Sequence, residues 1–121
     1  MSSRQFIIAA GCTFIFCAIL CALVLITRKG DPVAFAVTGT LFTNRTAEVP
    51  DPNLTVGYDG QFVYYIARDG AASLPLLDGP SFRLQRILYP LAGRLLAIGQ
   101  PALVPWSLLL INLVAQSIGA G

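Results

Sequence analysis

Two long apolar runs enclose a polar middle in this chain. The first run, Phe6 to Ile26, carries no charged side chain. A helix of about 20 such residues crosses a hydrocarbon core of about 30 Å, so we predict a transmembrane helix within residues 1–27 that follows a short cytoplasmic start. A signal peptide is the alternative, but the run exceeds the roughly 7 to 15 residues of a signal core and ends at Arg28-Lys29 instead of a cleavage site.

The second apolar run extends from Ala102 to Ile118, and no charged residue follows it up to Gly121. It predicts a second transmembrane helix within residues 102–121, and the missing charged flank leads us to expect a truncated one. Residues 28–101 then form a long loop, which we place on the extracytoplasmic side. Charge guides this orientation little, because a loop of more than about 60 residues can translocate whatever its charge.

Two stretches of the loop have the pattern of amphipathic helices. Near 58–69, helical spacing separates an apolar side from a polar one, made respectively of Phe62, Val63, Ile66, Ala67 and of Tyr58, Gln61, Tyr65, Arg68. Near 81–98, a narrow apolar stripe contains Leu84, Ile87, Leu88, Leu91, Leu95 and Ile98. Both helices are expected to lie along the membrane interface. Pro90 predicts a kink, or two helices with Pro90 at the first position of the second.

The remaining apolar segment of the loop, Val33 to Phe42, is rich in β-branched and aromatic residues. It favours a short strand or a buried loop. The predicted fold is therefore an all-α membrane protein, with one transmembrane helix, a long extracytoplasmic loop bearing interfacial amphipathic helices, and a second transmembrane helix.

Composition agrees with a membrane protein. The chain is 55% hydrophobic and 12% charged, about half the charge fraction of soluble domains, so membrane lipids are expected partners. The net charge of +2 is too small to indicate nucleic-acid binding. There is no histidine, so chemistry in the loop depends on carboxylates, tyrosines or arginines.

Asp59 does not fit the amphipathic pattern, because a continued helix would point it into the apolar side. In one interpretation it is the helix N-cap, a role worth about 1 kcal/mol, with Gly60 easing the turn. In the other, its carboxylate faces a cavity between this helix and the membrane helices, where partial desolvation makes it a better proton acceptor. Asp69-Gly70 and Asp78-Gly79-Pro80 are typical of a helix exit and a turn.

Arginines flank the apolar stripe of residues 81–98. A basic face beside a membrane contacts lipid headgroups in many proteins. Arginines also bind phosphate oxygens bidentately, and Arg83 and Arg86, one turn apart, could share one phosphate. Arg94 lies beyond Pro90 and is a weaker candidate.

The blocks YDGQFVYYIARDG and LDGPSFRLQRILYPLAGRLLAIG together resemble the first large extracytoplasmic loop of bacterial polytopic glycosyltransferases of the GT-C class. They are most similar to the branch of the PIG-V-type mannosyltransferases. The resemblance covers roughly Gly57 to Gly99. It departs from that branch where Arg-Ile-Leu replaces two aromatic residues before Tyr89-Pro90, so it does not define the sugar.

The resemblance implies a bacterial inner-membrane enzyme that transfers a sugar from a polyprenyl-phosphate donor to an acceptor. Such enzymes are much longer than this chain, which would be an amino-terminal part, inactive alone, that works with the remaining transmembrane helices of the full-length chain. The alternative is a small non-catalytic membrane protein whose loop packs on lipid headgroups or on a partner. Continuation of the reading frame into further apolar segments would favour the enzyme.

The resemblance also assigns roles to residues. Asp59 matches the acid that serves as general base on the acceptor hydroxyl, or that helps to bind a divalent metal in some branches. Beside it, Tyr64 or Tyr65 and Arg68 are implied substrate-binding residues. Arg83 and Arg86 fall where the second block begins and are implied ligands of the donor phosphate. No metal ligand set and no other cofactor is predicted.

Overall fold

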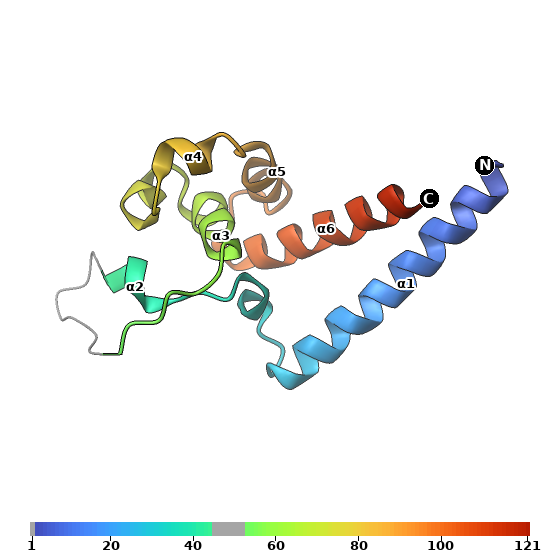
Figure 1. Ribbon diagram of the computed structural model, residues 1–121, viewed down its shortest axis with the longest axis horizontal. Helices are drawn as coiled ribbons and strands as arrows, with labels where there is room; N and C mark the ends of the chain where they lie inside the picture. The colour runs from blue at the N-terminus through green and yellow to red at the C-terminus, as the bar shows by residue number, and fades with distance from the viewer. Residues whose placement is uncertain (1, 45–52) are drawn as a thin grey trace. The chain divides into compact units, whose positions relative to one another are not determined.

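The computed structural model describes residues 2–44 and 53–121, and its regular elements are all helical (Figure 1). No strand occurs in these two ranges, which agrees with the predicted all-α class. The chain divides into two units, Met1–Pro32 with Leu109–Gly121, and Val33–Leu108. The loop predicted at 28–101 supplies most of the second unit.

The two predicted apolar helices are both present. Helix α1 (Ser3–Thr27) begins with a capping box, in which Ser2 Oγ accepts the Gln5 N–H at 3.4 Å and Gln5 Oε1 accepts the Ser2 N–H at 2.9 Å. Helix α6 (Val104–Ala120) follows a 3₁₀ turn, η4 (Pro101–Leu103). The spans Ser3–Thr27 and Pro101–Ala120 are long and apolar enough to cross a membrane.

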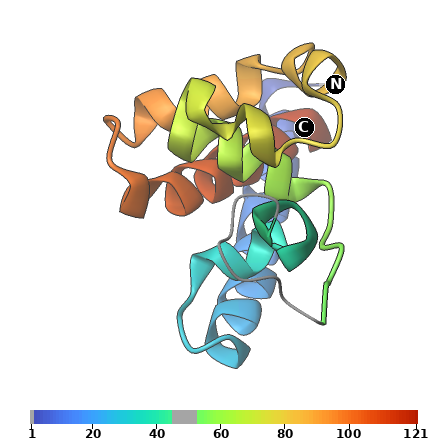
Figure 2. The same cartoon turned by 90° about the vertical axis from the view of Figure 1, so that its left-hand side faces the viewer.

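Helix α3 (Gly60–Asp69) is the centre of the second unit. It packs against the 3₁₀ helix η3 (Gly70–Leu76) and against α5 (Leu88–Leu96). Figure 2 shows α3 beside the chain of α4 and α5. The core residues of the unit are Phe42, Phe62, Tyr64, Tyr65, Ile66, Ala67, Leu77, Ala97, Val104 and Leu108.

Two residues of the polar side predicted near 58–69 are buried along with most of the apolar side, whereas Tyr58 is 72% exposed. Gln61 and Tyr65 are each 1% exposed. Gln61 Oε1 accepts the Gly39 N–H at 3.0 Å, and its Nε2 donates to the Val56 carbonyl at 2.8 Å. Gln61 is buried because it satisfies the backbone of the segments that cover it.

The short strand considered for Val33 to Phe42 is wrong. This segment forms a 3₁₀ helix, η1 (Pro32–Ala36), and a short helix, α2 (Thr40–Thr43). Beside one backbone bond, from the Leu41 N–H to the Thr55 carbonyl, the threonine hydroxyls join the two segments: Thr40 Oγ1 accepts the Thr55 N–H at 3.0 Å, and Thr55 Oγ1 accepts the Thr40 N–H at 3.1 Å. Side-chain bonds of this kind compete with regular strand pairing.

The stretch near 81–98 forms two helices rather than one kinked helix, which was one of the two alternatives predicted from Pro90. These are α4 (Pro80–Leu84) and α5. Pro90 is the third residue of α5 rather than the first. The first four N–H groups of a helix have no intrahelical acceptor, so proline loses no hydrogen bond there.

The helix exit predicted at Asp69-Gly70 is confirmed, since α3 ends at Asp69 and Gly70 follows with φ of 60°.

Small side chains let α5 lie against the first residues of α6. Gly93 is buried, and a Cβ placed on it would collide with the Leu108 side chain. Ser107 Oγ donates to the Gly93 carbonyl at 2.6 Å, and the Tyr89 hydroxyl donates to the Leu108 carbonyl at 3.1 Å. Helices approach this closely only where glycine or alanine lies between them.

Gly39→Ala is expected to destabilise the second unit by at least about 2 kcal/mol. A Cβ there would overlap the backbone of Thr55, Val56 and Gly57, which cannot move away as a side-chain tip could. Thermal unfolding in detergent should show a melting temperature lower by roughly 8 °C or more. Gly79→Ala is the control, because its Cβ would meet only Phe82 Cβ, at 3.9 Å. Equal melting temperatures for the two variants would contradict the packing described.

Candidate functional site

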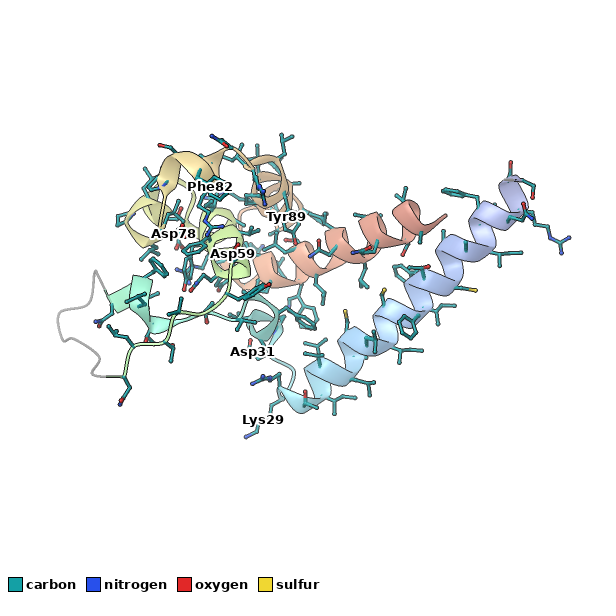
Figure 3. The ribbon with its side chains drawn as sticks, viewed as in Figure 1. Lys29, Asp31, Asp59, Asp78, Phe82 and Tyr89 are labelled. Carbon is teal, nitrogen blue, oxygen red and sulfur yellow. The ribbon has the colours of Figure 1, made fainter. Side chains whose placement is uncertain are left out.

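One guanidinium joins two carboxylates from separate segments. Asp59 directly precedes α3, Asp78 lies in the turn before α4, and Arg83 is in α4. Arg83 Nη2 donates to Asp59 Oδ1 at 2.9 Å and to Asp78 Oδ2 at 2.8 Å, while its Nε donates to Asp78 Oδ1 at 2.8 Å. Figure 3 labels both acids beside α3 and α4. Arg83 therefore holds Asp78 bidentately and Asp59 through one oxygen.

An aromatic ring supports this guanidinium. The Arg83 Cζ lies 4.2 Å from the centroid of the Phe62 ring, and the side chain is only 15% exposed. The hydrogen bonds that Arg83 donates to Asp78 and Asp59 raise the pKa of Arg83 further above its ordinary value. The hydrogen bond from Arg83 in turn lowers the pKa of Asp78. In this cluster the charged form of Arg83 is stabilised by two carboxylates and by the Phe62 ring.

Neither interpretation of Asp59 holds in full. Asp59 stands at the N-cap position, but its side chain makes no capping hydrogen bond, so the capping interpretation is wrong on that point. Its side chain is 74% exposed, which leaves little of the expected desolvation. The carboxylate is instead oriented by Arg83 across 24 positions of sequence.

Asp59 does line a cavity, of about 150 Å³, within the second unit. The other lining residues are Gly60, Phe62, Val63, Ile66, Arg83, Arg86 and Pro90. Arg86 is exposed, and its guanidinium contacts the Phe82 ring, with Cζ 5.6 Å from the centroid. Within residues 2–44 and 53–121 it makes no ion pair. The cavity thus combines an exposed carboxylate, a guanidinium paired with it and a second guanidinium that forms no ion pair with a described residue.

Two of the predicted substrate-binding residues lie away from this cavity. Arg68 is at the opposite end of α3, where its Nε and Nη2 donate to the Asp69 carboxylate at 2.7 and 2.6 Å. Tyr65 is buried and its hydroxyl lies 3.5 Å from Gln61 Oε1. Burial raises the pKa of Tyr65. Of the five predicted site residues, the structure brings together Asp59, Arg83 and Arg86.

Arg94 has a structural role. Its Nη1 donates to the Ala67 carbonyl at 3.1 Å and to the Arg68 carbonyl at 2.7 Å. These carbonyls belong to the last turn of α3, where no N–H group of the helix itself is available to donate to them. Arg94 therefore fastens α5 to the C-terminal end of α3.

The sequence predicts only a turn at Asp78 and only an apolar-side position at Phe62. Asp78 was attributed to its turn, yet it is the bidentate partner of Arg83. An acid five positions before an arginine, across a Gly-Pro turn, was the available signal. Phe62 gave no signal, because an apolar residue under a guanidinium has the same pattern as any core residue.

The part of the chain that the structure describes holds no group of three or more potential metal ligands. Asp59 and Asp78 converge on a guanidinium. No protein-family model, no curated protein and no solved structure matches the chain. The function proposed below accordingly depends on the residues and their geometry.

Stability should fall in acid through Asp78. Its pKa is lower in the folded chain than the ordinary value near 3.9, so ionised Asp78 stabilises the fold above that value. This contribution is lost as the pH falls through the lowered pKa. The drop in melting temperature between about pH 6 and about pH 3 should therefore be smaller in Asp78→Asn than in the unaltered chain. Parallel curves for the two proteins would refute the role of Asp78.

Proposed function

We propose that this chain is the amino-terminal part of an integral membrane glycosyltransferase of the GT-C class. It would transfer a sugar from a polyprenyl-phosphate donor to an acceptor hydroxyl at the bacterial inner membrane. The observation that carries the proposal is the exposed Asp59 carboxylate, oriented by Arg83, in a cavity that Arg86 also lines. An inverting transfer needs a base near the acceptor hydroxyl and a cation near the leaving phosphate.

In this mechanism Asp59 is the general base. Arg83 occupies Oδ1, and no described residue donates a hydrogen bond to Oδ2, which can accept the acceptor proton. The acceptor oxygen then forms a bond to the anomeric carbon as the bond from that carbon to the phosphate oxygen breaks. The electron pair leaves with the polyprenyl phosphate.

Arg86 is a better candidate than Arg83 for binding the leaving phosphate. Arg83 already serves two carboxylates, and a phosphate could bind it only in competition with them. Arg86 is exposed and lines the same cavity, so it can approach a phosphate without breaking an ion pair. We therefore assign Arg83 to positioning Asp59 and Arg86 to binding the donor.

The membrane placement completes the proposal. Helices α1 and α6 would cross the bilayer, with the amino terminus inside and residues 28–101 outside. The length and apolar composition of Ser3–Thr27 and Pro101–Ala120 support the crossing. A non-catalytic protein that packs on lipid headgroups is the second candidate, and the exposure of Arg86 next to Phe82 favours it.

Asp59→Asn in the full-length enzyme tests the catalytic role. Loss of a general base should lower the rate of transfer from a polyprenyl-phosphate sugar by about 10²- to 10⁴-fold. The matched control is Asp69→Asn, which removes the ion pair with Arg68 at the other end of α3 and should retain most of the activity. Equal melting temperatures would show that the loss is chemical. Full activity in Asp59→Asn would remove Asp59 from the mechanism and favour the non-catalytic protein.

A further inference from the structure

The amphipathic helix α5 has its apolar side turned outward. Its buried residues are the small or compact Pro90 and Gly93, together with Ala97 just beyond its end, which is 1% exposed. In contrast, Leu88 is 81% exposed and Leu95 is 70% exposed. A helix in water buries its apolar side and exposes its polar one. The inverted arrangement indicates that the medium around this face is apolar.

The same surface extends beyond α5. We define the leucine stripe as six exposed apolar residues between the end of α4 and the turn that follows α5, namely Leu84, Ile87, Leu88, Leu91, Leu95 and Ile98. It contains no acid, and the exposed Arg86 lies within its sequence range. Contiguous apolar surface with a basic border is typical of helices that lie in a lipid interface.

An open apolar cavity adjoins the stripe. It has a volume of about 240 Å³ and is lined by Ile66, Gly70, Ala71, Leu74, Leu84, Ile87, Leu91 and Arg94. Arg94 donates to the carbonyls of α3, so the walls offer few groups that could hold water. A hydrocarbon chain suits this space, which favours lipid over the flat face of a soluble partner.

The stripe is attached directly to a candidate membrane span. Tyr89 and Gly93 bond to Leu108 and Ser107 in the first turns of α6, and only a short connection separates Ile98 from Pro101, where the span begins. Trp106, 45% exposed, stands where tryptophans mark the membrane interface. If α6 crosses a bilayer, α5 lies at the surface of that bilayer.

We propose that the leucine stripe is inserted into the boundary between headgroups and acyl chains, with an acyl chain in the adjoining cavity. The proposal rests on the membrane placement given above but not on catalysis. It distinguishes the two predicted interfacial helices, because α3 is mostly buried in its own unit, whereas α4 and α5 present exposed apolar residues. Pro90 lines the Asp59 cavity, which brings that cavity near headgroup depth.

Nitroxide accessibility in lipid vesicles tests this proposal. In a background with Cys12, Cys17 and Cys21 replaced by alanine, single labels are placed through Leu88→Cys or Leu95→Cys. The control is Tyr58→Cys, since Tyr58 is 72% exposed but lies outside the stripe. The labelled full chain is reconstituted in phosphatidylcholine and phosphatidylglycerol and co-floated with the vesicles. Electron paramagnetic resonance then measures collisions with oxygen, which dissolves in lipid, and with a water-soluble nickel complex.

Labels at Leu88 and Leu95 are expected to favour oxygen over nickel severalfold more than the label at Tyr58. Nickel access equal to that at Tyr58 would show a face open to water and overturn the proposal. Low access to both reagents would show a face covered by protein, and failure to float would show that there is no membrane insertion; either overturns it too. The two labelled sites are so exposed that their substitution should leave folding intact. The transfer activity of Asp59→Asn is measured in a separate experiment, so a failure of the catalytic proposal can be told apart from a failure of the lipid-insertion proposal.

Discussion

The arrangement of the site depends on the sharing of the Arg83 guanidinium between Asp59 and Asp78. Its N–H groups donate hydrogen bonds to acids at the start of α3 and in the turn before α4. Its Cζ lies 4.2 Å from the centroid of the Phe62 ring. A delocalised, permanently charged cation suits this task, because it can serve a bidentate and a single acceptor at once. A lysine would offer one point charge and could not reproduce the pattern.

The carboxylate is held in place by a rigid support. Gln61, the second residue of α3, bonds to the backbone of the covering segments at Gly39 and Val56, and Arg94 bonds to the other end of the helix. Both ends of α3 are therefore fixed by partners distant in sequence. A general base must be kept within narrow limits to be effective, so this support would serve Asp59 in the catalytic role proposed above, while its side chain stays 74% exposed.

Local signals in the sequence were sufficient for several elements. Charge-free runs predicted α1 and α6, and Gly70 predicted the end of α3. Each of these depends on neighbours along the chain, on helix length or on side-chain chemistry. These signals act within a few residues, so a single sequence can carry them.

The rest depended on contacts between distant residues. A helical wheel shows that Gln61 is polar, but not that Gly39 and Val56 will cover it. It shows the leucine stripe, but not that Gly93 allows α5 to pack through its opposite side and so turns the stripe outward. The pairing of Arg83 with Asp59 spans 24 positions, which no local pattern records.

A double-mutant cycle between Arg83 and Asp78 tests the shared guanidinium most directly. Melting temperatures are measured at neutral pH for the unaltered chain, Arg83→Gln, Asp78→Asn and the double variant. If the two side chains act through each other, Asp78→Asn lowers the melting temperature clearly when Arg83 is present and much less when it has been replaced. An equal fall in both backgrounds would show that the pair is not coupled and would contradict the account of how Asp59 is positioned.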